Sequence, residues 1–181
     1  MLAKPLAFAL LPLLLLVQSS FAAEDPFDPD QQQIEEKTWE TLAGQLPSAP
    51  LPENLLPLRM GRTATLTFSV DAKSLSVDED GVVRYTLVAV SPTGTRNVSY
   101  EGIRCSSFEK RQYAFGQENG EWRPARNSQW EHISRNIVNH HHAILAQDYF
   151  CDVKRIAGDA KRILRRIRYD EPVNPRTDLQ Y

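Results

Sequence analysis

Five segments between residues 63 and 124 have the period of β-strands, and only short turns separate most of them. Residues 63–70 alternate between hydroxyl-bearing and apolar side chains, which indicates a strand with one buried face. Residues 82–90 are apolar on both faces beyond Arg84, which is typical of a central strand. Further strands are expected at 96–105, at 110–116 and around Trp122. Because consecutive strands joined by short turns form hairpins, we predict an antiparallel sheet of about five strands.

After residue 130 the apolar residues follow the period of a helix. From about Trp130 to Phe150 they fall in one wide arc, which predicts a main helix packed on the sheet. A weaker helix is expected over 154–168, where Gly158 lowers helix stability by roughly 1 kcal/mol. Within the third predicted strand, Gly102 indicates a bulge or a close approach. A sheet with helices on one side defines the fold class as α+β.

The N-terminus has the pattern of a secretory signal peptide. Lys4 precedes the apolar run Leu6 to Val17, and small residues follow, which predicts cleavage after Ala22. This run would cover about 18 Å as a helix, whereas the hydrocarbon core of a bilayer is about 30 Å thick. We therefore expect a cleaved signal peptide and not a membrane anchor, and a soluble periplasmic protein.

Charge and proline content divide the chain into four predicted regions. They are a signal peptide (1–22), an acidic, Pro-rich N-terminal segment (23–58), an α+β core domain (59–152), and a basic helix with a C-terminal tail (153–181). In the second region a short helix is expected over 31–43, followed by extended chain over the surface, because four prolines lie between residues 47 and 57. The first residues after the cleavage point and the C-terminal tail are expected to be flexible.

The chain contains two cysteines, Cys105 at the end of the third predicted strand and Cys151 after the main helix. In an exported protein, two cysteines most simply form one disulfide. This bond would link the helix to the sheet and would contribute roughly 4 kcal/mol in the chain-entropy model. Two cysteines are too few for a closed four-cysteine zinc site.

Three consecutive histidines, His140 to His142, lie within the main predicted helix. Consecutive helical residues point about 100° apart, so these three side chains cannot all face one metal ion. His141 lies on the apolar arc and is expected to be a histidine at the edge of the core with a hydrogen bond. No metal or other cofactor is predicted.

The sequence matches no catalytic template. It lacks the G-x-S-x-G motif of a nucleophile elbow and a phosphate-binding glycine loop, so no catalytic residue is assigned. The candidate lining of a ligand cleft at the end of the sheet is Tyr100, Glu101, Arg104 and Trp122. The alternative interpretation places the aromatic residues among them in the core.

Residues 152–168 carry seven basic side chains against two acidic ones. This basic helix is a candidate surface for a protein partner, an envelope component or an anionic membrane. The residues assigned to that surface are Arg155, Lys161, Arg162, Arg165 and Arg166. The alternatives are a solvated face or pairing with the acidic N-terminal segment. Export and a net charge of −2 argue against nucleic acid as a partner.

Four blocks of sequence, at residues 80–87, 91–105, 113–116 and 148–151, resemble the cryptic neisserial protein-like family. The resemblance extends over roughly residues 60–170. It implies a single-domain protein that Gram-negative bacteria export through a signal peptide. It also supports the pairing of Cys105 with Cys151, because both lie inside matching blocks, but it implies no reaction.

Two functions from different classes remain open at this point. The first is a non-enzymatic periplasmic module that binds the envelope or a protein partner through the basic helix. The second is a small-ligand-binding protein, or an enzyme, that uses a cleft on the sheet. The sequence identifies neither a reaction nor a partner, and it does not determine the oligomeric state.

Overall fold

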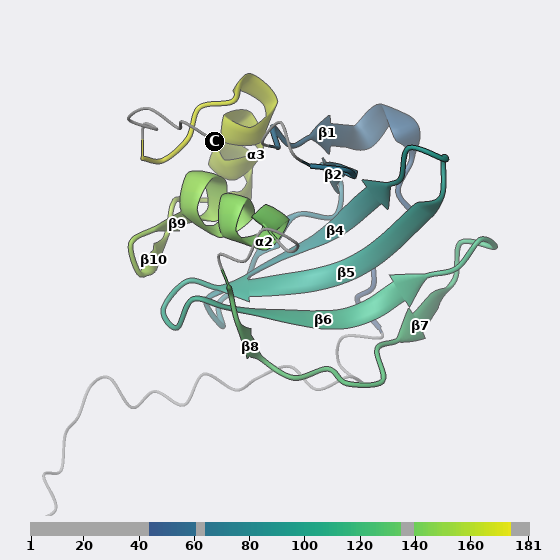
Figure 1. Ribbon diagram of the computed structural model, residues 1–181. Helices are drawn as coiled ribbons and strands as arrows, with labels where there is room; N and C mark the ends of the chain where they lie inside the picture. The colour runs from purple at the N-terminus through teal and green to yellow at the C-terminus, as the bar shows by residue number, and fades with distance from the viewer. Residues whose placement is uncertain (1–43, 61–63, 135–139, 175–181) are drawn as a thin grey trace, which may run out of the picture. The chain divides into compact units, whose positions relative to one another are not determined.

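The computed structural model describes residues 44–60, 64–134 and 140–174, all within one compact unit, Ile34–Tyr181. The predicted signal peptide and the predicted helix at 31–43 lie outside the described residues. Figure 1 shows a curved sheet and a set of short helices.

The antiparallel sheet is confirmed, and the five strands expected from the sequence form its main path. They are neighbours in chain order: β2 (Thr67–Asp71), β4 (Val82–Val90), β5 (Arg96–Arg104), β6 (Glu109–Gly116) and β7 (Trp122–Pro124). β4 lies between β2 and β5, as its apolar sequence predicts. Gly94, with a φ of +87°, lies in the turn from β4 to β5, a conformation that glycine adopts without strain.

Three short strands complete this sheet: β1 (Leu55–Pro57), β3 (Ser76–Val77) and β8 (Glu131–His132). The Pro-rich stretch was expected to run over the surface, and its last part instead forms the 3₁₀ turn η1 (Pro52–Asn54) and then β1, which pairs with β2. Pro57 is compatible with this place because β1 is an edge strand, where a missing N–H breaks no second ladder.

The main helix is shorter than the sequence predicts. It consists of α2 (His140–Ile144), which continues as the π-helical segment η3 (Leu145–Phe150). The predicted start at Trp130 is wrong, because the next two residues form β8 and pair with β6. An ion pair of 2.8 Å between Lys110 and Glu131 crosses this strand pair. Cross-strand contacts therefore outweigh helical periodicity in this stretch.

The second helix, α3 (Ala160–Tyr169), also begins later than predicted. Before it, β9 (Cys151–Asp152) and β10 (Arg155–Ile156) form a separate hairpin. Gly158 has a φ of +133°, outside the helical region, so it lies before the helix and does not weaken it. The Asp159 side chain caps α3 by accepting a 2.8 Å bond from the Arg162 backbone N–H.

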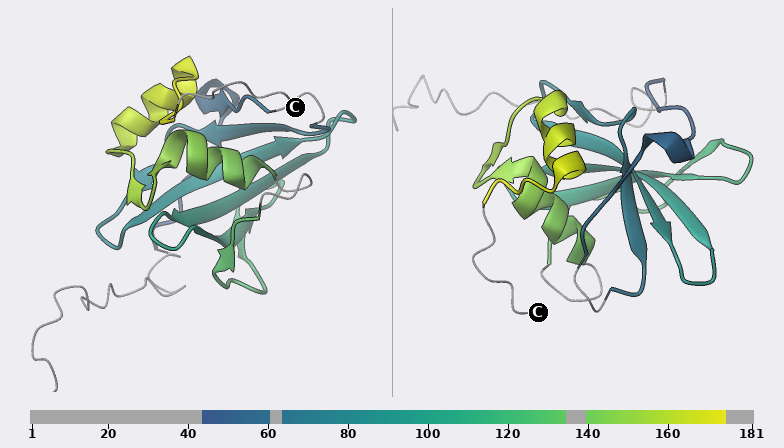
Figure 2. Two further views of the ribbon diagram at one scale, coloured as in Figure 1. Left: turned by 60° about the vertical axis from the view of Figure 1, so that its left-hand side comes forward. Right: turned by 90° about the horizontal axis from the view of Figure 1, so that it is seen from above.

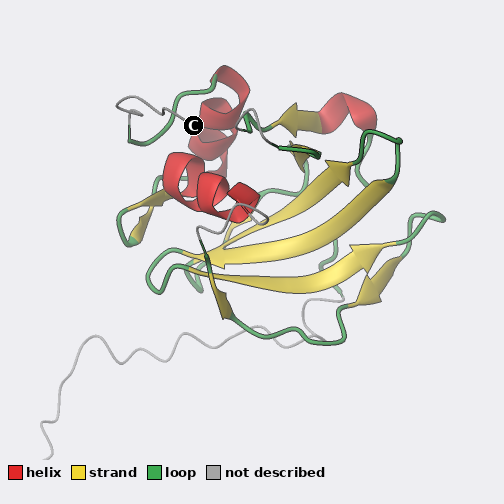
Figure 3. Ribbon diagram, in the orientation of Figure 1, coloured by secondary structure: helices red, strands yellow, loops and turns green. Residues whose placement is uncertain are grey.

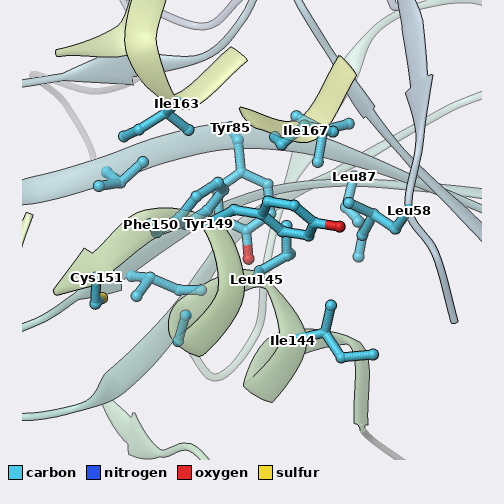
Figure 4. Close-up of a cluster of buried hydrophobic side chains, with 14 of the residues drawn as sticks. Leu58, Tyr85, Leu87, Ile144, Leu145, Tyr149, Phe150, Cys151, Ile163 and Ile167 are labelled. Atoms are coloured by element: carbon cyan, nitrogen blue, oxygen red, sulfur yellow. The ribbon is translucent and has the colours of Figure 1, made fainter. Parts of the chain in front are cut away.

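The helices pack on one face of the sheet, which confirms the α+β class (Figures 2 and 3). Tyr85 of β4 meets Phe150 edge to face at 5.1 Å, and Ile163 and Ile167 of α3 are buried in the same core (Figure 4). The predicted disulfide is also confirmed: Cys105 and Cys151 are bonded, with their Cα atoms 5.5 Å apart. It joins the end of β5 to the end of the main helix.

The opposite face of the sheet carries a smaller cluster of Tyr100, Tyr113 and Ala114, with Leu46 and Trp122 packed against it. The indole N–H of Trp122 donates to the Pro47 carbonyl at 2.7 Å, so the Pro-rich segment contacts this face. Gly102 makes the close approach expected of it, since a Cβ there would lie 2.9 Å from Val82 Cγ1 and 2.8 Å from the Tyr113 hydroxyl.

Candidate functional site

A buried carboxylate, that of Glu101 on β5, lies at the centre of the helix-covered face. Glu101 and Tyr85 are direct partners across the β4–β5 pair, so their side chains share this face. The Tyr85 hydroxyl donates to Glu101 Oε2 at 2.9 Å, and the Ser99 hydroxyl donates to Oε1 at 2.6 Å. Ser99 lies two residues before Glu101, and the strand period places it on the same side.

The helix supplies a further partner of this carboxylate. His142 of α2 places Nε2 2.8 Å from Glu101 Oε2, and Gln112 of β6 lies 3.5 Å from Oε1. A carboxylate offers about four acceptor positions, so Glu101 is saturated by these partners. Because an ionised carboxylate only accepts, Nε2 of His142 is the donor. Within the described chain, its Nδ1 is buried and has no hydrogen-bond partner.

These contacts keep Glu101 ionised although it is buried. Burial by itself raises the pKa of a carboxyl group, but the charge and hydrogen bond of His142, with the Ser99 bond and the His141 charge, lower it to about 2. The pKa of the Tyr85 hydroxyl moves the other way, well above its usual value, because of burial and the adjacent Glu101 charge. The site therefore holds one fixed negative charge next to imidazole.

The histidine run contributes two of its side chains to this region. His141 stacks on Phe68 with ring centroids 4.2 Å apart, so the prediction of a histidine at the edge of the core is confirmed. The His142 ring lies 4.0 Å from that of His141. Nothing is described of the His140 side chain.

The arrangement differs from a nucleophilic relay. In such a relay the hydroxyl donates to the imidazole, which is in turn oriented by the acid. Here Ser99 and His142 both donate to the same carboxylate, so the imidazole does not activate the hydroxyl. The shared carboxylate instead holds the Ser99 and His142 side chains in fixed orientations, as in the polar part of a binding site.

A cleft of about 320 Å³ adjoins this network. One part of its lining is apolar: Phe68, Leu87, Ala89, Val98 and Phe115. The other part is polar: Asn97, Ser99, Glu101, Lys110, Arg111, Gln112, His141 and His142. A mixed concave surface of this kind is suited to a small molecule with an apolar body and a polar end.

The four residues predicted to line one cleft are not brought together. Only Glu101 lines the cleft described above. Tyr100 and Trp122 lie on the opposite face, with their rings 6.0 Å apart, in the small cluster there. The Arg104 guanidinium stacks over the Trp130 ring at 4.0 Å. Burial raises the pKa of Tyr100 to about 12, as expected for a core residue.

Sequence reasoning missed Tyr85, Ser99 and His142 as partners of Glu101. Alternation along β5 already places Ser99 and Glu101 on one face, and this signal was available. The contact with Tyr85 depends on the register between β4 and β5. The contact with His142 depends on how α2 docks, and no local pattern reports it.

The opposite face holds a second buried charge, that of Arg84 on β4. Its guanidinium is bonded to Asp78 at 2.8 Å and also to Asp80, both in the turn just before the strand. Burial would lower the pKa of Arg84, but the hydrogen bond and charge of Asp80 outweigh it, so the pKa is raised. This pair lies away from the cleft, whose lining does not include it.

The candidate partner surface lies on the β9–β10 hairpin and α3. Arg155, Lys161, Arg162 and Arg165 are exposed, whereas Arg166 is half-buried. Arg165 forms a 2.8 Å ion pair with Glu171. Among the residues that the structure describes, no group of three or more His, Cys, Asp or Glu is placed to hold a metal ion. In the same part of the chain, no helix is long and apolar enough to cross a membrane.

Together these features define a disulfide-linked α+β protein with an antiparallel sheet, one helix-covered face and a polar cleft beside a buried carboxylate. A family model described as the CNP1-like family matches residues 34–168. The chain belongs to this family, which confirms the resemblance seen in the sequence. No match was found among curated proteins or among solved structures.

Proposed function

We propose that this protein is an exported, non-enzymatic binding module of the bacterial envelope, and that its cleft binds a small amphipathic molecule. The observation that carries the proposal is the cleft of about 320 Å³, whose lining combines apolar side chains with polar groups that include Glu101 and its partners. The apolar body of the ligand would lie on Phe68, Leu87 and Phe115. Its polar end would meet Asn97 and Gln112.

The bonding of Glu101 supports binding rather than catalysis. A general base needs a free acceptor position within reach of the proton that it removes. The acceptor positions of Glu101 are occupied by Tyr85, Ser99, His142 and, at 3.5 Å, Gln112. The carboxylate therefore holds His142 in place instead of exchanging protons with a ligand.

Two observations support the envelope location. The N-terminal residues have the pattern of a cleaved signal peptide, which would deliver the protein to the periplasm. The disulfide between Cys105 and Cys151 is a bond that persists in oxidising compartments.

The test uses 1-anilinonaphthalene-8-sulfonate, a fluorescent molecule with an apolar body and a charged end. Ala89 lines the cleft, so Ala89→Trp fills it. The matched control is Ala49→Trp, which fills a separate cavity of about 570 Å³ beside Trp122. We expect Ala89→Trp to weaken probe binding at least about tenfold and Ala49→Trp to leave it unchanged.

Circular dichroism and the melting temperature of each variant establish that it is folded. Equal probe binding by wild type and a folded Ala89→Trp would contradict the cleft as the binding site. Native mass spectrometry of the protein taken from the periplasm tests occupancy directly, since a natural ligand would add mass that Ala89→Trp abolishes.

A further inference from the structure

The tip of the β9–β10 hairpin has a conformation that its residue disfavours. The register pairs Asp152 with Arg155, so Val153 and Lys154 form a two-residue tip. Val153 has a φ of +57°, where glycine or asparagine is usual and a β-branched residue is an outlier. Its side chain is 81% exposed, so burial does not offset this strain. Uncompensated strain of this kind often marks a functional position.

The hairpin is firmly attached at its base. Cys151 is bonded to Cys105, and the Ala157 N–H donates to the Phe150 carbonyl at 2.7 Å. Figure 1 shows the hairpin projecting where the main helix ends. The fold therefore holds an exposed valine away from the core on a rigid support.

Basic side chains surround this tip and continue onto α3. We call the following residues the basic surface: Lys154, Arg155, Lys161, Arg162, Arg165 and Arg168, all of which are exposed. Ile163 and Ile167 bury the inner side of α3, so the arginines occupy its outer side. Arg162 lies against Gly158, in the short link between the hairpin and α3, since a Cβ there would come within 2.7 Å of its Cδ.

A second exposed apolar side chain lies at the other end of this segment. Tyr169, the last residue of α3, is 64% exposed. Among the described residues the large exposed hydrophobics are Leu51, Val153 and Tyr169, so two of the three flank the basic surface. Tyrosine is favoured at the boundary between water and lipid, where its ring and its hydroxyl find different surroundings.

We propose that the basic surface, with Val153 and Tyr169, docks this protein peripherally on an anionic lipid bilayer. Basic residues are attracted to anionic headgroups, and a small apolar tip enters the interface. Charge by itself would suit an acidic protein equally well. The two exposed apolar side chains favour lipid, because they gain from leaving water at a bilayer surface. The cleft described above includes none of these residues.

The experiment measures co-sedimentation of the exported protein with vesicles, after mass spectrometry has established its N-terminus. One set of vesicles is pure phosphatidylcholine, and the other contains one third phosphatidylglycerol. We expect binding to the anionic vesicles only, and less of it as salt is raised. Equal sedimentation with both sets, or with neither, overturns the proposal.

The first variant removes three charges: Lys161→Gln, Arg162→Gln and Arg168→Gln. Each basic residue near an anionic surface contributes about fivefold in partitioning, so the triple variant should bind about 100-fold more weakly. The matched control, Lys73→Gln, Arg123→Gln and Arg126→Gln, makes the same change in net charge at exposed positions of β7 and of the loops after β2 and β7. Equal loss in both triple variants shows attraction by net charge alone and overturns the assigned surface.

The second variant, Val153→Asn, separates docking from folding. Asparagine tolerates the positive φ, so the melting temperature should rise, while partitioning should fall about fivefold. Leu51→Asn, at a residue 52% exposed outside the basic surface, should leave partitioning unchanged. If Val153→Asn binds like wild type and soluble polyglutamate displaces both proteins from vesicles, the partner is an acidic macromolecule and the lipid proposal fails.

Discussion

The two faces of the sheet each bury one charged group, and the two charges are stabilised in different ways. Arg84, on the face opposite the helices, pairs with Asp78 and Asp80, which lie six and four residues before it. Glu101, on the helix-covered face, is bonded to groups on β4, β5, β6 and α2. The first pair is a property of one turn and strand, whereas the second exists only when the helix has docked.

The two buried charges also differ in the groups to which they are coupled. Arg84 is charged at every accessible pH, and its partners neutralise it at short range. Glu101 is coupled to an imidazole, the side chain whose ordinary pKa lies nearest to physiological pH. The local pair is therefore suited to structure, and the long-range network is the one that lies at a cleft. Four predictions test this division.

The largest effect should come from the disulfide, which belongs only to the helix-covered face. Replacing Cys105 and Cys151 by serine should lower the free energy of unfolding by about 4 kcal/mol, because the bond closes a loop with a separation of 46 residues. Urea unfolding at pH 7 measures the loss. Reduction of the wild-type protein should produce the same shift, and a loss below about 1 kcal/mol would contradict this assignment.

Arg84→Leu tests the local pair on the face opposite the helices. It leaves the buried Asp80 carboxylate without its cation, so the free energy of unfolding should fall by about 3 to 4 kcal/mol. The lower part of the usual range is expected because Asp78 is 25% exposed and keeps some water. Arg123→Leu, at an exposed position of β7, is the control and should change stability by less than about 0.5 kcal/mol.

Lowering the pH should destabilise the fold through the Glu101 network. The folded pKa of Glu101, about 2, lies below its ordinary value of 4.5, so the charged form stabilises the fold above about pH 5. That contribution, roughly 3 kcal/mol, is lost as the pH falls through 4.5 toward 2. Glu101→Gln should therefore be less stable than wild type at pH 7, and the difference should shrink in acid.

The exposed Glu118→Gln variant is the control for this titration and should follow the wild-type pH profile. A Glu101→Gln protein with the same acid dependence as wild type would show that the carboxylate is not the group that titrates.

The smallest effect should come from Gly102→Ala, which acts on the face opposite the helices. Gly102 pairs with Arg84 across the strands, and its new Cβ would press on Tyr113 and Val82. We expect a loss of about 2 kcal/mol from overpacking, with the cleft probe still bound. Thr95→Ala, in the exposed turn before β5, should be neutral in the same thermal-unfolding measurement.

The errors in the helix boundaries have one physical origin. Helical periodicity extends back to Trp130 and Lys154, but residues in both places belong to strands. Glu131 forms a cross-strand pair with Lys110, and Arg155 is paired with Asp152 in the hairpin. A hydrophobic period records which side chains are apolar, and it does not record a competing strand partner elsewhere in the chain. Gly158 marked the true boundary, because its positive φ lies outside the helix.

The sequence by itself determined the five main strands, their antiparallel order, the α+β class and the pairing of Cys105 with Cys151. These features follow from alternation, short turns and cysteine count, which depend on neighbours along the chain. Alternation also separates Tyr100 from Glu101, because adjacent residues of a strand face opposite sides. Only the tertiary structure decided that His142 meets Glu101, because a contact across 41 residues depends on strand register and helix docking.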